Sequence, residues 1–182
     1  MDPAINTNAR LTLITGPARS GKTNLAVQWA LSFPAPRVYI ATAQNRDAEM
    51  AERIRRHQEE RGMAFQTYEE PLSLNTLLKK LSDSSSIILV DCLTLWVSNL
   101  LGDFGENTLE IRQSLEDFLA GLKNLKAPII LIGNEVGWGI VPDNPLARTF
   151  RDISGRLQQD IAQKADQVIL MVAGIPLVVK GK

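Results

Sequence analysis

Residues 11–23, "LTLITGPARSGKT", join a short apolar run to a glycine-containing segment. "LTLIT" is a short apolar run with β-branched residues, which predicts a buried strand. "GPARSGKT", residues 16–23, matches the pattern GxxxxGK[ST], and a helical pattern follows at about 22–33. A strand before this pattern and a helix after it are the context that a phosphate-binding loop requires. The sequence therefore predicts a P-loop, and a chance Gly/Ser-rich turn is the alternative.

The residue types in this loop each have a physical reason to be there. Gly16 and Gly21 let the backbone curl so that successive N–H groups point at phosphate oxygens. Lys22 supplies a positive charge at the β- and γ-phosphates, and Thr23 supplies a hydroxyl for Mg²⁺. We therefore expect the nucleotide to contact the whole loop: Gly16, Pro17, Ala18, Arg19, Ser20, Gly21, Lys22 and Thr23.

Short apolar runs alternate with longer amphipathic stretches along the rest of the chain. Further runs lie at 38–42, 87–91, 128–133 and 167–172, and further helical patterns at about 46–61, 72–82, 107–124 and 145–165. Because parallel strands need crossover connections, this order predicts an α/β fold with a mostly parallel sheet flanked by helices. We expect a single P-loop domain at 11–182 after an N-terminal tail at 1–10.

The C-terminal segment "QVILMVAGIPLVVK", residues 167–180, breaks the alternation. Two apolar runs there flank Ala173 and Gly174, which leaves no room for a crossover helix. The second run should therefore turn back and pair antiparallel with the first. The sequence predicts an antiparallel hairpin at the edge of the sheet.

Net charge, cysteine content and the length of apolar runs indicate which partners and which cellular compartment to expect. Twenty Lys and Arg residues balance twenty Asp and Glu residues, so the net charge gives no global case for binding nucleic acid or an anionic membrane. The one cysteine, Cys92, lies in an apolar run, and a buried thiol in a reduced compartment is the simplest interpretation. No apolar run approaches the roughly 18 residues of a membrane helix. We therefore expect a cytoplasmic protein without membrane insertion or a nucleic-acid partner.

Asp91 closes the apolar run "IILVD" at 87–91. At the C-terminal edge of a parallel sheet, a carboxylate beside a P-loop can hold a water on Mg²⁺. An Asp in this position is, taken alone, more often a cap or turn residue. Its pairing with the P-loop favours the metal role, so Thr23 and Asp91 are the predicted metal-side residues.

Several classes of P-loop protein fit this sequence poorly. The NKxD motif with which small GTPases read the base is absent, and "DISG" at 152–155 falls inside a helical pattern. Motors and transporter ATPases generally need a larger chain or a partner domain, and the sequence offers no signature of one. A small-molecule kinase or transferase remains, with a non-catalytic nucleotide-binding protein as the second class.

Several separated stretches carry a resemblance to a known family. They are "GPARSGKT", "YIATA", "RIRRHQEER", "LVDCLTLWVSNLL", "NEVGWGIVP" and "LARTFRDISGRLQQDIAQKADQVILMVAGIPLVVK". In this order, from Leu11 to Lys180, they resemble the bifunctional adenosylcobinamide kinase/adenosylcobinamide-phosphate guanylyltransferases of cobalamin biosynthesis. Pro17 stands where a second loop glycine is common in that family, and Gln158 where an asparagine is common. Neither departure replaces a group with obvious chemistry.

The resemblance implies a P-loop, RecA-like fold, a homo-oligomer with a trimer as a candidate size, and two linked reactions. In the first, ATP or GTP with Mg²⁺ phosphorylates the hydroxyl on the aminopropanol arm of adenosylcobinamide. In the second, GTP gives its GMP to adenosylcobinamide phosphate through a covalent enzyme–GMP intermediate, and pyrophosphate leaves. The resemblance makes His57 the nucleophile, with Lys22 as the other catalytic residue. A kinase without nucleotidyl transfer would leave His57 without a covalent role.

His57 is the only histidine and lies in "RIRRHQEER", residues 53–61. On a helix it shares a face with Arg53, Glu60 and Arg61. The neighbouring arginines disfavour a second positive charge and so keep the imidazole neutral, as a nucleophile must be. From spacing alone, a solvated helix face with Glu–Arg pairs four residues apart is the simpler interpretation. The resemblance favours catalysis.

The same resemblance implies further nucleotide contacts, and Glu69 is the most informative of them. Besides the P-loop, the implied contacts are Ala41, Thr42, Ala43, Gln58, Glu59, Glu60, Arg61, Glu69 and Asp91. A carboxylate can pair with the N1–H and the N2 amine of guanine, which gives Glu69 a physical reason to select GTP. A surface acid beside Glu70 is the alternative.

Two pairs of residues near the predicted active edge each allow two interpretations. Asn134 and Glu135 follow a predicted strand and can point toward the active edge, or serve in a hairpin or cap. Arg148 and Arg151 on the next helical pattern can hold a substrate phosphate or pair with Asp152. The sequence does not decide between these alternatives.

The three tryptophans differ in context. Trp29 and Trp96 lie in apolar helical runs, so we expect them in the core. Trp138 lies in a Gly-rich segment and can pack on a corrin edge or on a neighbouring subunit.

Overall fold

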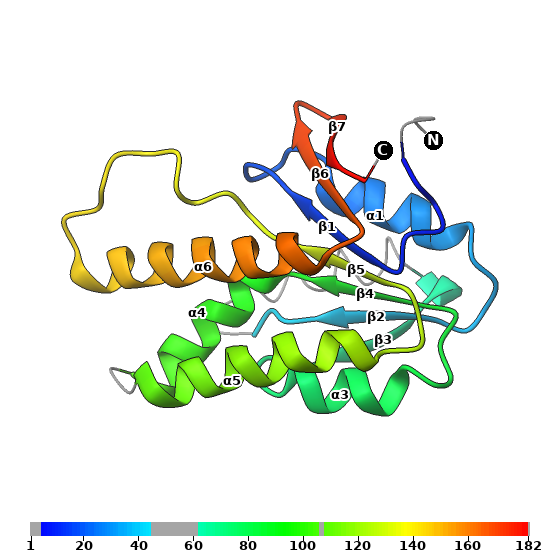
Figure 1. The fold of residues 1–182 in the computed structure, drawn as a ribbon, viewed down its shortest axis with the longest axis horizontal. Coiled ribbons are helices and arrows are strands. Elements are labelled where there is room, and N and C mark those ends of the chain that lie inside the picture. Colours follow the sequence, from blue (N-terminus) through cyan, green and yellow to red (C-terminus); the bar gives the residue numbers. More distant parts are fainter. Residues whose placement is uncertain (1–4, 45–61, 106–107, 182) are drawn as a thin grey trace.

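A computed structural model describes residues 5–44, 62–105 and 108–181, and Figure 1 shows its ribbon. The strands are β1 (Leu11–Thr15), β2 (Arg37–Ala41), β3 (Gln66–Glu69), β4 (Ile87–Asp91), β5 (Ile129–Ile132), β6 (Gln167–Val172) and β7 (Ile175–Lys180). The helices are α1 (Lys22–Leu31), α3 (Leu74–Leu81), α4 (Leu93–Phe104), α5 (Thr108–Gly121) and α6 (Pro145–Lys164), with short 3-10 helices at Gly62–Ala64 and Leu122–Asn124.

The sheet has the strand order β3-β2-β4-β5-β1-β6-β7. Neighbours pair parallel except for β6 and β7, which pair antiparallel. The turn between those two strands is Ala173 and Gly174, both with positive φ, as a two-residue hairpin turn that matches strand twist requires. The prediction of a mostly parallel sheet with a C-terminal antiparallel hairpin is confirmed.

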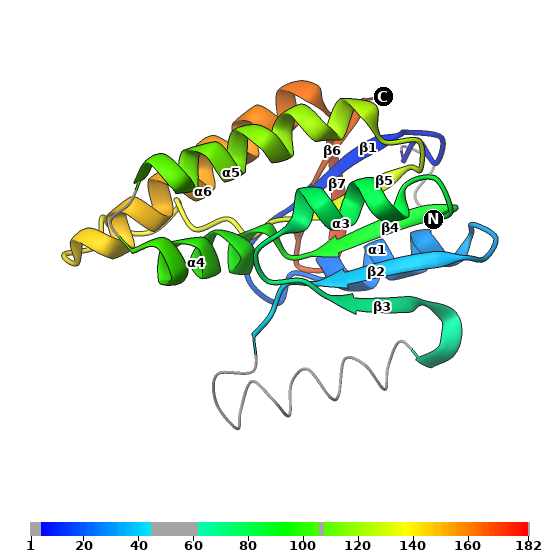
Figure 2. The ribbon, with the colours of Figure 1, turned by 90° about the horizontal axis from the view of Figure 1, so that it is seen from below.

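Side chains of the central strands alternate between two buried cores, because successive residues of a strand point to opposite faces. Leu13 and Val90 pack on the side of α3, α4, α5 and α6, whereas Ile14 and Leu89 pack on the side of α1. Figure 2 shows the sheet between these two helical layers. Both faces of the central strands are therefore covered.

Strand β3 is absent from the predicted strands, and helix α4 is expected from the sequence only as the apolar helical run that contains Trp96. Strand β3 has the mostly exposed sequence "QTYE", so its pairing with β2 forms it rather than an apolar pattern of its own. Helix α4 is buried along most of its length. Its nearly continuous apolar run "LTLWVSNLL" therefore lacks the alternation of apolar and polar residues by which an amphipathic helix is recognised. The predicted helix at 46–61 lies outside the described residues.

The tryptophan predictions can be compared directly with the structure. Trp29 and Trp96 are each 1% exposed, which confirms their core positions. The ring of Trp96 packs on Phe118 with centroids 4.8 Å apart, and its Nε1 donates to Leu72 O over 2.8 Å. Trp138 is 70% exposed.

The segment before β1 packs against the domain from residue 5 onward. Ile5 joins the core on the α1 side and is 6% exposed. The backbone N–H groups of Arg10 and Leu11 both donate to Asp166 Oδ2 over 2.9 Å. These bonds tie the start of β1 to the residue just before β6.

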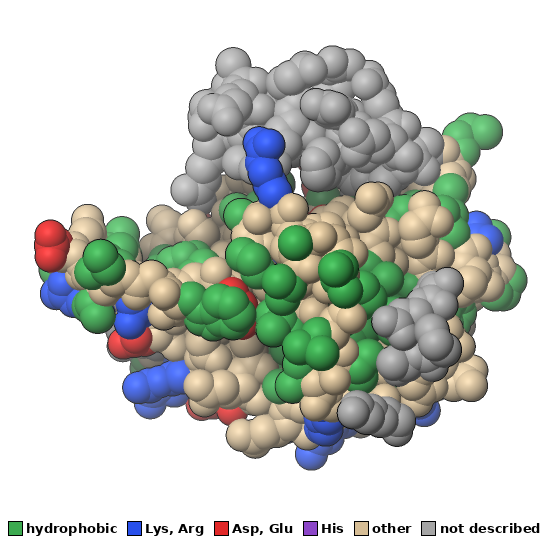
Figure 3. Space-filling view, turned by 90° about the horizontal axis from the view of Figure 1, so that it is seen from above, with side chains coloured by type: hydrophobic (Ala, Val, Ile, Leu, Met, Phe, Trp, Pro, Cys, Tyr) green, Lys and Arg blue, Asp and Glu red, His purple; other side chains and the backbone are tan. Residues whose placement is uncertain are grey.

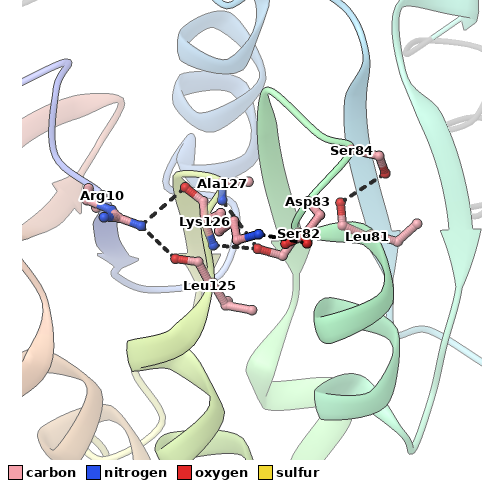
Figure 4. A network of polar contacts seen from close by, with 8 residues as sticks. All are labelled: Arg10, Leu81, Ser82, Asp83, Ser84, Leu125, Lys126 and Ala127. Carbon is pink, nitrogen blue, oxygen red and sulfur yellow. Dashed lines mark hydrogen bonds and ion pairs between the residues drawn. The ribbon is translucent and has the colours of Figure 1, made fainter.

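A polar network closes the edge of the sheet at which the strands begin (Figure 4). The Arg10 guanidinium donates to Leu125 O over 2.6 Å and to Lys126 O over 3.2 Å. Ser82 Oγ accepts the N–H of Lys126 over 2.6 Å. Lys126 and Asp83 form an exposed ion pair, which contributes little to stability. These hydrogen bonds engage backbone groups of the loops at this edge.

An apolar face stays exposed on the C-terminal hairpin. Val172, Ile175, Leu177 and Val179 expose from 48% to 69% of their surface. Figure 3 shows hydrophobic side chains gathered on the side of the molecule that carries this hairpin. Within residues 5–44, 62–105 and 108–181, no helix has the length and apolarity needed to cross a membrane.

Candidate active site

The strand ends that carry the predicted site lie in one row. Ala41 pairs with Glu69 on one side and with Asp91 on the other, and Asp91 pairs with Ile132. Ile132 in turn pairs with Ile14, two residues before the P-loop. The register therefore brings the end of β2, Asp91, Glu69 and the P-loop to the carboxyl edge of the sheet, where ligands bind in open α/β folds.

Backbone geometry explains the two P-loop glycines. Gly16 has φ 142°, and a Cβ there would lie 2.5 Å from Met171 O on β6. Gly21 has φ 94° and is the N-cap residue of α1, whose first N–H groups have no partner within the helix. The hairpin turn contacts the loop as well, since Gly174 N donates to Ser20 O over 3.0 Å. The loop is thus preformed as an anion-binding turn ahead of a helix N-terminus.

Lys22 is 5% exposed, and its ammonium group lies inside this loop. Its Nζ donates to Gly16 O over 2.9 Å and to Pro17 O over 2.7 Å. Burial lowers the pKa of Lys22, and the acidic groups of Cys92, Asp91 and Glu135 partly offset this effect. The two carbonyls hold the cation within the P-loop.

Asp91 accepts two hydrogen bonds on one carboxylate oxygen. Thr23 Oγ1 donates to Asp91 Oδ2 over 2.9 Å, and Tyr39 Oη donates to the same atom over 2.6 Å. Asp91 does not cap α4, because that cap is the Cys92 sulfur, which accepts the N–H of Leu95. Tyr39 is a partner that the sequence did not reveal, since it lies in an ordinary buried strand.

The residues at this point fit a magnesium ion that is shared with phosphate. The Thr23 hydroxyl and the Asp91 carboxylate converge as oxygen donors, which Mg²⁺ prefers. Among the described residues there is no group of three or more His, Cys, Asp or Glu side chains that could hold a metal alone. Thr23 and Asp91 would hold such an ion, which would neutralise phosphate charge there.

The "ATA" segment, Ala41–Ala43, is held in place through Thr42, which is fully buried. Thr42 Oγ1 donates to Cys92 O over 2.7 Å and accepts the N–H of Cys92 over 2.8 Å. Asn99 on α4 donates its Nδ2 to Thr42 O over 2.7 Å and to Pro71 O over 3.2 Å. The Thr42 side chain is therefore engaged within the protein, so this segment would meet a nucleotide through its backbone and its alanines.

Glu69 and Glu70 are distinguished by what they contact. Glu70 Oε1 accepts the N–H groups of Leu72 over 3.0 Å and Ser73 over 2.7 Å, in the turn that leads into α3. Glu69 ends β3 and is exposed at the carboxyl edge. The predicted role of Glu69 toward guanine stays a prediction, and Glu70 holds the turn before α3. His57 and the predicted contacts Gln58, Glu59, Glu60 and Arg61 lie outside the described residues.

The end of β5 contributes a second carboxylate beside the P-loop. Glu135 Oε1 accepts a hydrogen bond from Thr15 Oγ1 over 2.9 Å, and Glu135 N donates to Gly16 O over 3.0 Å. Gln158 on α6 binds the same region: its Oε1 lies 2.7 Å from Thr15 Oγ1, and its Nε2 donates to Asn134 O over 3.1 Å. Asn134 and Glu135 are therefore part of the P-loop surroundings and not of a hairpin.

Arg148 and Arg151 both bind backbone carbonyl oxygens, and the interpretation that they hold a substrate phosphate stays a prediction. Arg148 Nη1 donates to Pro142 O over 2.9 Å and to Asp143 O over 2.7 Å. Arg151 Nη1 reaches Gly139 O over 3.5 Å and Ile140 O over 3.4 Å. Both guanidinium groups thus hold the loop that follows Glu135, and no bond to Asp152 forms among the described residues.

Comparison with known proteins decides the family. Residues 12–179 match the family described as "Cobinamide kinase / cobinamide phosphate guanyltransferase". The chain is 41% identical to "Bifunctional adenosylcobalamin biosynthesis protein CobP" of Pseudomonas aeruginosa, over 93% of this chain and 97% of that protein. It is 42% identical to the corresponding CobU protein of Salmonella typhimurium, over 93% and 99%. The chain belongs to the cobinamide kinase/cobinamide phosphate guanylyltransferase family.

The Escherichia coli member of this family, also described as "Bifunctional adenosylcobalamin biosynthesis protein CobU", is 36% identical over 93% of this chain and 99% of its own length. Among solved structures, the flagellar accessory protein FlaH from Methanocaldococcus jannaschii superposes with a TM-score of 0.50 at 13% identity, over 94% of this chain and 78% of that one. At that identity the likeness concerns the fold alone. The P-loop, RecA-like α/β class is confirmed.

The two departures from the family pattern are readily accommodated. Pro17 is exposed, and it contributes its carbonyl oxygen, which accepts hydrogen bonds from Lys22 Nζ and from Ser20 N. A backbone carbonyl is present whatever the side chain, so the loop geometry does not depend on glycine at this position. Gln158 uses both ends of its amide, as described above, and an asparagine would present the same groups on a shorter arm.

Proposed function

We propose that this protein phosphorylates adenosylcobinamide with a nucleoside triphosphate and then transfers GMP from GTP to adenosylcobinamide phosphate. The products are adenosylcobinamide-GDP and pyrophosphate. The match to the cobinamide kinase/cobinamide phosphate guanyltransferase family across residues 12–179 is the observation that carries this proposal. The preformed P-loop with Lys22, Thr23 and Asp91 supports it, because both reactions start from a triphosphate held with Mg²⁺.

In the kinase step, the P-loop binds the triphosphate of ATP or GTP, and Lys22 faces its β- and γ-phosphates. The substrate hydroxyl oxygen forms a bond to the γ-phosphorus, and the bond between that phosphorus and the β,γ-bridging oxygen breaks. The hydroxyl proton leaves to a base, and a nucleoside diphosphate is released. Positioning and charge stabilisation by the protein supply most of the catalysis in such transfers.

In the guanylyltransferase step, we propose that His57 attacks the α-phosphorus of GTP and expels pyrophosphate. An oxygen of adenosylcobinamide phosphate then attacks the histidine-bound phosphorus, and the histidine leaves. The resemblance of "RIRRHQEER" to the family motif supports this role. A neutral imidazole flanked by arginines suits it chemically, because the arginines stabilise the charge on the phosphates.

A direct assay tests the proposed function. Purified protein incubated with adenosylcobinamide, MgATP and MgGTP should form first a corrinoid heavier by one phosphate and then one that carries GDP, both resolved by liquid chromatography and mass spectrometry. Adenosylcobinamide phosphate supplied instead should give the GDP product with GTP alone. A protein that binds nucleotide yet forms neither corrinoid product would be the non-catalytic nucleotide-binding protein, and the proposal would fail.

Glu69→Gln should weaken GTP binding by about tenfold and ATP binding by less than about twofold, if Glu69 reads guanine. The carboxylate pairs with two donors of guanine that adenine lacks, and losing one charge-assisted hydrogen bond costs roughly this factor. Competition of unlabelled GTP and ATP against a fluorescent nucleotide measures both affinities. Glu70→Gln, which alters the neighbouring carboxylate of the α3 turn, is the matched control. Equal losses for the two nucleotides would assign Glu69 a structural or metal-side role.

We also propose that the protein works in the cytoplasm as a homo-oligomer, with a trimer as a candidate size. The biosynthetic descriptions of its relatives support the first point. The exposed aliphatic side chains of Val172, Ile175, Leu177 and Val179 support the second, because a contiguous apolar face is a common feature of protein–protein interfaces.

A further inference from the structure

Glu135 is a carboxylate at the active edge that the reactions, as described so far, do not use. It follows β5, next to the P-loop strand β1, and it is half-buried. Its backbone N–H is bonded to Gly16 O, so its position is tied to the loop that holds the phosphates. Burial lowers the pKa of Lys22, and the Glu135 carboxylate is one of the groups that partly offset this effect, so it lies within electrostatic reach of the ammonium. It therefore lies close to the region where a γ-phosphate would be bound.

The hydrogen bonds of Glu135 leave it able to accept a proton. Thr15 Oγ1 has a single proton and lies within bonding distance of both Glu135 Oε1, at 2.9 Å, and Gln158 Oε1, at 2.7 Å. If Glu135 turns to another donor, the Thr15 hydroxyl keeps a partner in Gln158. No other side chain among the described residues donates a hydrogen bond to Glu135, so releasing it leaves no buried polar group unpaired.

Asp91, the other carboxylate beside the P-loop, is placed differently. It already accepts bonds from Thr23 and Tyr39 on one oxygen, and its partner Thr23 is the P-loop residue that suits a metal ion. A carboxylate engaged in this way is poorly placed to take a proton from substrate. The two carboxylates therefore differ in environment, which is how enzymes separate the roles of two acids in one site.

We propose that Glu135 is the general base of the kinase step, an inference that rests on the function proposed above. As the substrate hydroxyl oxygen bonds to the γ-phosphorus and the bond to the β,γ-bridging oxygen breaks, the hydroxyl proton passes to the Glu135 carboxylate, directly or through one water. The proton then leaves to solvent after the nucleoside diphosphate departs. The guanylyltransferase step has no such need, because its acceptor is a phosphate oxygen that is already anionic. Glu135 therefore serves one of the two reactions only.

Glu135→Gln tests this assignment, because glutamine keeps the size and the oxygen that accepts from Thr15 but cannot take up a proton. Its kcat with adenosylcobinamide should fall by about 10²–10⁴-fold, the usual contribution of a general base. Guanylyl transfer from GTP to separately prepared adenosylcobinamide phosphate should stay within about threefold of wild type, and so should the Kd for GTP. A loss of less than about tenfold in kinase kcat, or an equal loss in both reactions, would overturn the proposal.

Two further variants separate catalysis from structure. Thr15→Val removes the hydroxyl that donates to Glu135. If Glu135 acted only through this hydrogen bond, Thr15→Val and Glu135→Gln would lower the kinase kcat equally. We expect Thr15→Val to lower the kinase kcat by about tenfold or less. A loss as large as that of Glu135→Gln would contradict the assignment of Glu135 as general base. Asp160→Asn, an exposed carboxylate on α6, controls for net charge and should leave both reactions unchanged. Wild-type protein that forms neither product would instead refute the proposed function, and this inference with it.

Discussion

Lys22→Ala is expected to abolish phosphoryl transfer and to reduce guanylyl transfer by at least about 10³-fold. The ammonium is nearly completely buried inside the P-loop, where it is bonded to the carbonyls of Gly16 and Pro17. Its removal takes away the buried cation of the P-loop, and one charge-stabilising group in an active site commonly contributes about 10²–10³-fold to the rate. Both reactions start from the same bound triphosphate, so both should suffer.

The kcat/KM values of the two assays, together with the Kd for GTP, check this expectation. Lys80→Ala on the exposed side of α3 is a matched control that removes one lysine far from the loop. Circular dichroism and thermal unfolding show whether the variant folds, because the two carbonyls lose an internal donor. Turnover within a few-fold of wild type in both assays, by a folded Lys22→Ala protein, would remove the P-loop from the mechanism.

His57→Asn should eliminate covalent labelling and guanylyl transfer while kinase activity persists. Asparagine keeps a polar side chain of similar size but cannot form a bond to phosphorus. Wild-type protein incubated with Mg²⁺ and α-labelled GTP should retain the label through denaturation, and γ-labelled GTP should leave none, because pyrophosphate departs with that phosphorus. A phosphoramidate of histidine should also be acid-labile and stable in alkali.

The two labels and the two reactions make the result decisive. Retention of the α-label by His57→Asn would mean that another residue is the nucleophile, or that none is needed. Retention of the γ-label alone by wild type would indicate a phosphorylated enzyme and not a guanylylated one. Persistence of kinase activity is the internal control, because it shows that the P-loop and Asp91 still bind nucleotide in the variant.

Local sequence patterns predict the P-loop, the central strands and the C-terminal hairpin of this protein. "GPARSGKT" predicts a P-loop because its glycines and its flanking elements are local requirements, and the structure has Gly16 and Gly21 at positive φ in that turn. Buried central strands are predictable because their apolar runs are short and β-branched. The C-terminal hairpin is predictable because only two residues separate its strands. Each of these features depends on neighbours in the chain, so the sequence alone contains the signal.

Other features depend on contacts between residues that are distant in the chain. Strand β3 exists because β2 pairs with it, and α4 is apolar on most sides because other helices and the sheet cover it. Tyr39 reaches Asp91 across 52 positions of sequence, and Thr15 meets Glu135 and Gln158 across 120 and 143. Arg148 and Arg151 bind loop carbonyls and not Asp152, which the sequence leaves open. Such pairings follow from how the strands and helices pack, and no local periodicity encodes which side chains then meet.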